Sequence, residues 1–121
     1  MPKTYVLKFG GTSICLRGLQ VMKKRIQELG SKNIIIVCSA KSKVTNLLIS
    51  VKSSQDKNNI EQVINIYNEL IKELGLVNYE NKFLNELKTY LSRDICVNDS
   101  NDIVSYGELI SNSIICDCLC L

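Results

Sequence analysis

The segment TYVLKFGGTS, residues 4–13, decides how the chain begins to fold. Residues 4–9 predict a β-strand, because aromatic and β-branched residues favour extended structure. The strand ends near Lys8, and two glycines and two hydroxyl residues follow before any helical pattern begins. Since burial of an unpaired ammonium is costly, the Lys8 side chain either reaches water or meets a negatively charged partner.

The next residues complete a strand–helix–strand unit. Apolar residues at helical spacing predict an amphipathic helix that ends at Gly30, and they are Leu19, Met22, Ile26 and Leu29. Residues 33–39 predict a second strand, whose apolar centre is typical of a parallel strand covered on both faces. A strand, a helix and another strand over this length predict a parallel βαβ unit.

The remaining sequence predicts helices. We expect them at residues 44–51, 60–74, 83–91 and 102–119, with a polar, mobile segment at 52–59 and a polar break at 98–102. Two strands are too few for a stable parallel sheet, whose strands need neighbours on both sides. The chain therefore resembles the opening part of a larger α/β domain, and we expect residues 1–121 to be the N-terminal portion of that single domain.

Composition and charge exclude several classes of protein. The net charge of +3 is too small and too evenly spread to indicate a nucleic-acid partner. No apolar run is long enough to span a membrane, and residues 1–20 lack the apolar centre of a secretory signal. Residence in the cytosol or nucleus is the default, and we predict a cytoplasmic protein without a membrane partner.

Six cysteines and the absence of histidine restrict metal binding and catalysis. Cys116, Cys118 and Cys120 have C-x-C-x-C spacing, which differs from the paired C-x-x-C of zinc sites. We therefore predict no metal site, and we interpret the cysteines as small buried hydrophobic residues in a reducing compartment. Without histidine, the usual Ser-His-Asp and Cys-His mechanisms are excluded, whereas phosphoryl transfer suits the remaining residue types.

The loop after the first strand has the chemistry of an anion site. Ligands of open α/β sheets bind beyond the carboxyl ends of the strands, where Lys8 lies. Gly10 and Gly11 allow backbone amides to approach a ligand closely, and Thr12 and Ser13 can cap the next helix, whose N-terminus favours an anion. The alternative is a glycine turn with a lysine that reaches solvent. The order of residues also differs from a Walker A loop, in which Lys follows the glycines.

Two further segments could belong to the same site. SAKSKVTN, residues 39–46, follows the second strand, so both loops line one rim if the strands are neighbours. Thr45 can bind a ligand or act as a helix cap. In SYGE, residues 105–108, a glycine within a helical pattern needs a packing or close-approach reason. Its neighbour Glu108 can bind a substrate cation, or it can be a solvated helix residue.

Together, KFGGTS, VCSAKSKVTNLL and VSYGELIS resemble, in this order, the N-terminal part of aspartate kinases. The resemblance implies the amino-acid kinase fold, a three-layer α/β/α sandwich. It also implies that ATP, with Mg²⁺, phosphorylates the side-chain carboxylate of L-aspartate to give 4-phospho-L-aspartate. That carboxylate is already ionised at neutral pH, so the reaction needs no histidine base.

The resemblance also implies residue roles. Lys8 would contact the transferring phosphoryl group and stabilise its charge. The residues of the two loops would bind or face the phosphates of the nucleotide: Gly10, Gly11, Thr12, Ser13, Ser39 and Ala40. Thr45 would bind the aspartate substrate, and Glu108 would bind its ammonium group.

The chain departs from the family pattern in two respects. Many members have glycine between Ser-Ala and Val-Thr-Asn, where this chain has KSK, residues 41–43. Family enzymes also continue with a GRGGSD-like segment that this sequence does not contain. An alternative to an aspartate kinase, or a fragment of one, is therefore a catalytically inactive, truncated remnant that interacts with a full-length kinase. Whether the chain forms a homo-oligomer stays open.

Overall fold

The computed structural model describes residues 3–30, 33–54, 56–95 and 99–119. Its first part is the predicted βαβ unit. The elements of this unit are β1 (Tyr5–Phe9), the 3₁₀ turn η1 (Gly11–Ser13), α1 (Leu16–Leu29) and β2 (Ile34–Cys38). The strands are parallel neighbours, and Lys8 pairs with Val37 in the register. The parallel pairing predicted from the sequence is confirmed.

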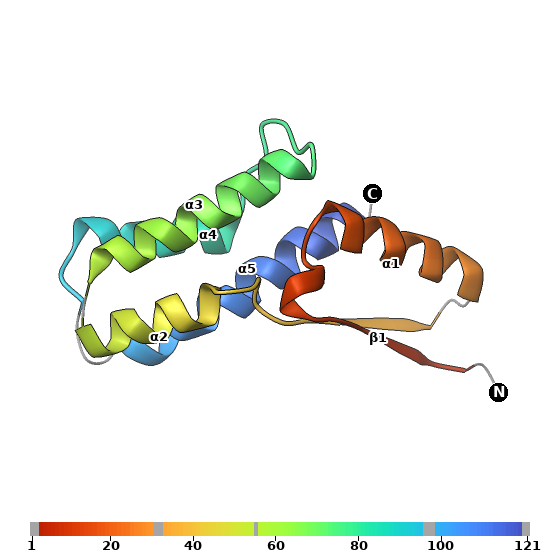
Figure 1. Ribbon diagram of the computed structural model, residues 1–121, viewed down its shortest axis with the longest axis horizontal. Helices are drawn as coiled ribbons and strands as arrows, with labels where there is room; N and C mark the ends of the chain where they lie inside the picture. The colour runs from red at the N-terminus through yellow and green to blue at the C-terminus, as the bar shows by residue number, and fades with distance from the viewer. Residues whose placement is uncertain (1–2, 31–32, 55, 96–98, 120–121) are drawn as a thin grey trace.

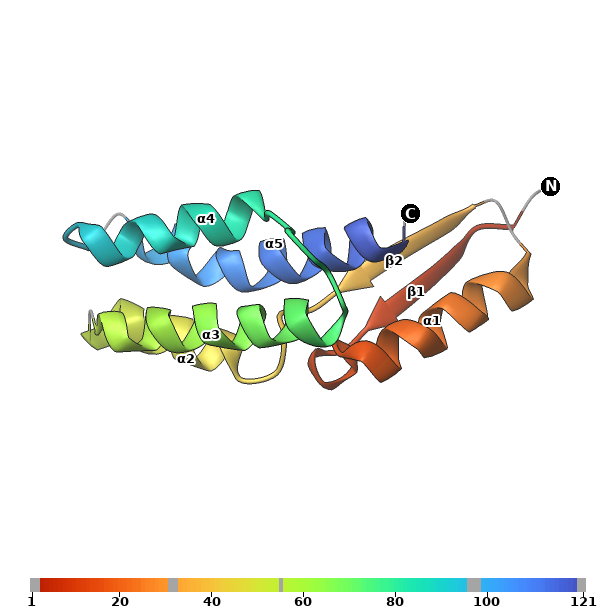
Figure 2. The same cartoon turned by 90° about the horizontal axis from the view of Figure 1, so that it is seen from above.

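The second part is helical (Figure 1). Its elements are α2 (Val44–Ser54), α3 (Lys57–Glu73), α4 (Lys82–Thr89), the 3₁₀ turn η2 (Tyr90–Ser92) and α5 (Ser100–Leu119). Seen from above, α5 runs out of this helical half and reaches the side of β2 (Figure 2). It therefore connects the helices to the sheet. None of the helices described here has both the length and the apolar character to cross a membrane.

The segment between α2 and α3 is shorter than we predicted. We expected a polar, mobile segment at 52–59, but α2 continues to Ser54 and α3 begins at Lys57. The hydroxyl of Ser54 donates to the carbonyl of Ser50 within the helix, and Asp56 caps α3 by accepting a hydrogen bond from the amide of Asn58. Polar residues that bond to the local backbone are compatible with helix ends, so polarity alone was misleading.

Only one face of the two-stranded sheet is covered. Phe9 and Cys38 are buried on the face that packs against α1 and α5, whereas Val6, Ile35 and Val37 on the other face are 64%, 53% and 45% exposed. Our expectation that β2 is covered on both faces is therefore wrong for this chain. The fold is a mixed α/β structure, mostly helical, with a small parallel sheet. The described residues form no second helical layer over Val6 and Val37, so the three-layer sandwich is not observed.

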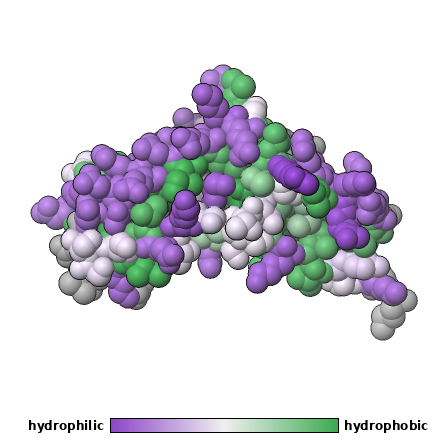
Figure 3. Space-filling model, viewed as in Figure 1, coloured by the Kyte–Doolittle hydropathy of each residue, from purple (hydrophilic) through white to green (hydrophobic). Residues whose placement is uncertain are grey.

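The last two helical predictions are close to the structure. The predicted helix at 83–91 corresponds to α4 and η2, and the predicted 102–119 corresponds to α5, which begins at Ser100. Part of the expected polar break at 98–102 lies outside the described residues. On the molecular face shown in Figure 3, hydrophilic residues surround exposed hydrophobic ones near the middle of the molecule.

Candidate functional site

The first loop (residues 10–13) and the second loop (residues 39–43) pack against each other beyond the carboxyl ends of the strands. The amide of Ser39 donates to the carbonyl of Phe9 over 3.1 Å, and the amide of Ser42 donates to the carbonyl of Gly11 over 3.1 Å. A Cβ atom at Gly11 would lie only 2.9 Å from the carbonyl oxygen of Ala40. The prediction that both loops line one rim is confirmed, and Gly11 is required for their close approach.

Lys41 connects the two loops, a role that the sequence analysis missed. Its ammonium Nζ donates to the carbonyl of Ile14 over 2.7 Å, and its backbone amide donates to the hydroxyl of Ser111 over 3.0 Å. One residue therefore ties the second loop both to Ile14, directly after the first loop, and to α5. No local pattern could have revealed these contacts, because the partners are distant in the sequence.

The buried side chain of Tyr67 supports the second loop through α5. The hydroxyl of Tyr67 donates to the carbonyl of Gly107 over 2.7 Å and lies 2.8 Å from the hydroxyl of Ser111. Burial raises the pKa of Tyr67 to about 12, although its hydrogen bond to Ser111 acts in the opposite direction. The tyrosine therefore keeps its proton near neutral pH and remains a donor. Through Ser111, it links α3 to the amide of Lys41.

Gly107 is explained by packing. A Cβ atom at this position would lie 2.9 Å from the Cβ of Ala40 and 3.1 Å from Cγ1 of Val44. The glycine thus allows α5 to lie directly against the second loop and the start of α2. Of the two reasons predicted from the sequence, the structure supports close packing within the chain.

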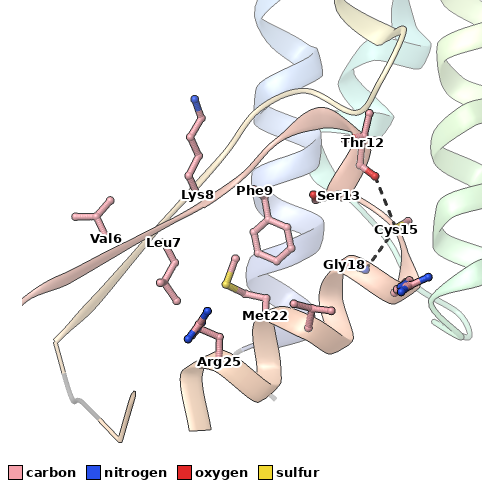
Figure 4. A pocket seen from close by; sticks show the side chains of 12 residues that line it. Val6, Leu7, Lys8, Phe9, Thr12, Ser13, Cys15, Gly18, Met22 and Arg25 are labelled. Atoms are coloured by element: carbon pink, nitrogen blue, oxygen red, sulfur yellow. Dashed lines mark hydrogen bonds between the residues drawn. The ribbon is translucent and has the colours of Figure 1, made fainter. Parts of the chain in front are cut away.

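Lys8 points away from the covered face of the sheet. Figure 4 shows its side chain on the side of β1 opposite Leu7 and Phe9, which point toward α1. The Lys8 side chain is exposed, so its ammonium group contacts water. Beneath the strand, a pocket of about 490 Å³ lies between β1 and α1, and the cationic side chains of Arg17 and Arg25 line it.

Gly10 differs from Gly11 in its surroundings. Its φ of −75° is allowed for any residue, and no atom lies within 4 Å of a Cβ built at this position. Neither backbone conformation nor internal packing therefore requires glycine here. The space beside Gly10 remains accessible to a ligand.

The cap of α1 is not the one we predicted. Thr12 and Ser13 lie in η1, and the N-cap of α1 is Cys15, whose Sγ accepts a hydrogen bond from the amide of Gly18 over 3.4 Å. The chain makes an additional 3₁₀ turn before the helix, which moves both hydroxyl residues away from the cap position. Gly18 was also missed, and a Cβ there would lie 1.7 Å from the carbonyl oxygen of Ser13.

The two predicted substrate residues lie on different helices. Thr45 is exposed at the second position of α2, so it does not occupy the N-cap position that the alternative interpretation assigned to it. Glu108 is exposed on α5. One turn later, the side-chain Nδ2 of Asn112 donates to the carbonyl of Cys38 over 3.0 Å, and its Oδ1 accepts from the backbone amide of Cys38 over 3.2 Å. Asn112 therefore fixes α5, and with it Glu108, near the carboxyl end of β2.

The second loop contains a strained residue. Lys43 has a φ of 74°, in the left-handed region that favours glycine. This residue belongs to the KSK segment, residues 41–43, in which the sequence differs from the pattern that it otherwise resembles.

The cysteines are less uniformly buried than we predicted. Cys38 and Cys118 are buried, Cys15 is intermediate and Cys116 is exposed. Cys96 and Cys120 lie outside the described residues. Within the described part of the chain, no three His, Cys, Asp or Glu side chains gather where they could hold a metal ion.

Comparison with solved structures identifies a similar fold. The structure of E. coli aspartokinase III in complex with aspartate and ADP, in the R-state, matches with a TM-score of 0.63 at 21% identity. Its T-state complex with lysine and aspartate matches with a TM-score of 0.60 at 19% identity. Each match covers 93% of this chain, which spans 28% of the length of the aspartokinase III chain. At this identity, the match shows a shared fold.

Neither a protein-family model nor a curated protein sequence matches the chain. The similarity is thus structural, and it extends over the βαβ unit and the helices that follow it.

Proposed function

We propose that residues 1–121 form the N-terminal part of the catalytic domain of an aspartate kinase. ATP would phosphorylate the side-chain carboxylate of L-aspartate to give 4-phospho-L-aspartate, the first step toward lysine, threonine and methionine. The observation that carries the proposal is the contact between the first and second loops beyond two parallel strands, in a fold like that of aspartokinase III. In open α/β sheets, ligands bind at this edge.

The charges at this edge suit phosphoryl transfer. The exposed ammonium of Lys8 is available to a transferring phosphoryl group, whose negative charge spreads over its oxygens in the transition state. The space beside Gly10 admits close approach of a phosphate to the backbone. We assign Gly11, Thr12, Ser13, Ser39 and Ala40 to the same nucleotide side of the site.

The substrate side is proposed for α2 and α5. Thr45 offers a hydroxyl to aspartate, and the carboxylate of Glu108 offers an opposite charge to its ammonium group. Both side chains are exposed and therefore available. Because the aspartate carboxylate is already ionised, positioning of the two anionic reactants is the main task of the site.

ATP and Mg²⁺ are the proposed cofactors. A nucleotide fits the donor set, because lysine ammonium and backbone amide groups are phosphate ligands. When bound with the nucleotide, Mg²⁺ supplies further neutralisation of the phosphate charge. The residues that we assign to the nucleotide side would contact phosphate oxygens, and we assign none as a metal ligand.

One observation favours a second candidate function. Val6, Ile35 and Val37 form an exposed apolar surface on the uncovered face of the sheet. Such a surface suits contact with another protein. The second candidate is therefore an inactive remnant that interacts with a full-length kinase.

A hybrid enzyme tests the first candidate against the second. Residues 1–121 replace the structurally matching N-terminal segment of E. coli aspartokinase III, and hydroxylamine traps aspartyl phosphate as its hydroxamate. We expect turnover that depends on both ATP and aspartate. A folded hybrid, judged by circular dichroism and gel filtration, that shows no turnover would contradict the proposed function and favour the remnant.

A further inference from the structure

Two cysteines that are far apart in the sequence lie at the junction of β2 and α5. Cys38 and Cys116 both line a pocket of about 370 Å³ between these elements, together with apolar residues of the strand and the helix. Ile34 and Ile36 line the same pocket, so the Cys38 side chain lies on the strand face that is turned toward α5. Both residues are thiols in this structure.

The backbone contacts limit the separation of the two residues. The side chain of Asn112 bonds to both the amide and the carbonyl of Cys38, at 3.2 and 3.0 Å. Cys116 follows Asn112 by one helical turn, a rise of about 6 Å along the axis, and lies on the same side of α5. Burial is the main cause that raises the pKa of Cys38 to about 11, and the negative charge of a Cys116 thiolate raises it further. This second effect requires the two side chains to lie close together.

We propose that Cys38 and Cys116 form a reversible disulfide that links β2 to α5. The oxidant is a small-molecule disulfide. The exposed Cys116 thiolate attacks one sulfur of the oxidant and releases the first thiol, which leaves a mixed disulfide on Cys116. The Cys38 thiolate then attacks the Cys116 sulfur, forms the protein disulfide and releases the second thiol. The two protons lost by the cysteines leave on the two released thiols.

The order of the two steps follows from exposure and ionisation. Cys116 is exposed and is therefore the accessible site for the first attack. Cys38 is buried with a raised pKa, so it reacts poorly with an oxidant in solution but is adjacent to a disulfide formed on Cys116. The second step should accelerate as the pH rises toward the pKa of Cys38.

Pairing of Cys116 with Cys118 does not compete. Cys116 and Cys118 are two residues apart on a helix, so their side chains do not face each other. Burial is the main cause of the raised pKa of Cys118, and the charge of Lys23 on α1 acts against it. The thiol of Cys118 therefore lies near α1, away from the pair.

The bridge would act on the strand end that leads into the second loop. Cys38 is the last residue of β2, and Ser39 begins the loop. A covalent bond here would reinforce the Asn112 contacts and hold α5 against the sheet. The proposal rests on these contacts, on the shared pocket and on the exposure of Cys116, and it does not depend on the proposed kinase activity.

Peptide mapping tests the proposal directly. The native chain is incubated with oxidised glutathione, remaining thiols are blocked with N-ethylmaleimide, and the sample is digested with trypsin and Asp-N without reduction. Cleavage yields peptide 33–41, which contains Cys38, and peptide 102–116, which contains Cys116 and no other cysteine. We expect the linked pair of these two peptides to be at least about tenfold more abundant than any other cross-linked pair, and reduction to release both.

Three variants sharpen the test. Cys38→Ser and Cys116→Ser should each abolish the linked peptide, whereas Cys118→Ser, the matched control on α5, should retain it. Cys38→Ser should instead accumulate glutathione on Cys116. When the chain is unfolded in concentrated urea, oxidation should no longer favour this pair of cysteines. Persistent glutathionylation of Cys116 in the folded wild-type chain, or preferential linkage of either cysteine to another, would overturn the proposal.

Discussion

Lys8 is the residue on which the proposed chemistry depends most directly. Its ammonium is exposed beside the first loop, where a phosphoryl group would develop charge. In the hybrid enzyme, we expect Lys8→Ala to lower kcat by about 100-fold or more, because the lost interaction is strongest in the transition state. The KM for aspartate should change little. Steady-state kinetics measure both, with the exposed Lys24→Ala on α1 as the matched control, and an unchanged kcat would remove Lys8 from the catalytic role.

Glu108 is proposed to act on binding. An ammonium–carboxylate contact exists in both the ground state and the transition state, so its loss is mainly a loss of uniform binding. We expect Glu108→Ala to raise the KM for aspartate by about 10-fold or more and to leave the KM for ATP unchanged. Asp102→Ala, an exposed acidic residue in the first turn of the same helix, is the control. A selective rise in the KM for ATP would assign Glu108 to the nucleotide side instead.

The left-handed backbone conformation of Lys43 leads to a prediction about stability. A non-glycine residue in the left-handed region costs about 1–2 kcal/mol, of which the greater chain entropy of glycine offsets a part. We therefore expect Lys43→Gly to increase the free energy of unfolding by about 0.5–1 kcal/mol. Lys43→Ala removes the same charge but keeps the strain, so urea titration should show no comparable gain for it. Equal effects of the two substitutions would mean that charge, and not φ, is responsible.

At the scale of elements, α5 carries the greatest number of roles in the described structure. It contributes Ser111 to the Tyr67 network, Asn112 to the end of β2 and Gly107 to the contact with α2. Its position against the second loop therefore determines where Glu108 lies. A change in the packing of this helix should alter stability and the site together.

Gly107→Ala tests this packing. The new methyl group would lie 2.9 Å from the Cβ of Ala40, so the helix must shift despite its gain in helix propensity. We expect a net destabilisation of about 1 kcal/mol, measured by urea denaturation. Ala40→Gly removes the opposing methyl group, and the double variant should recover part of the loss. Additive effects of the two substitutions would show that this contact does not set the position of α5.

The whole molecule combines half of a proposed site with an uncovered sheet face. The chain spans 28% of the aspartokinase III chains that share its fold, and the groups that we propose for phosphate binding lie along one exposed edge. We expect the purified polypeptide of residues 1–121 to show no measurable aspartate kinase activity in the hydroxamate assay. Turnover within about tenfold of an active aspartokinase, by a clean monomer, would show that this portion suffices for catalysis.

The same polypeptide should self-associate through the exposed apolar face. Gel filtration at increasing concentration measures this, and the double variant Ile35→Thr, Val37→Thr is the control, because threonine keeps β propensity but lowers apolar exposure. If the variant elutes like the wild type at every concentration, the sheet face is not the contact.

Most helices and both strands of this protein follow from local residue patterns. Helical periodicity predicted α3, Gly30 marked the end of α1, and the βαβ spacing implied parallel strands with both loops at one edge. These features depend on local geometry and on the handed, short connections between neighbouring elements, which a single chain encodes in its residue pattern.

The contacts between distant residues became clear from the folded arrangement of the helices and the sheet. This arrangement showed that Cys15 rather than Thr12 caps α1, that Lys41 ties the loops together, and that Asn112 holds the end of β2. It also exposed Val37, which the sequence predicted to be covered. The physical reason is that such contacts join residues up to 74 positions apart, and their energy depends on how the helices pack on the sheet, which no local pattern contains.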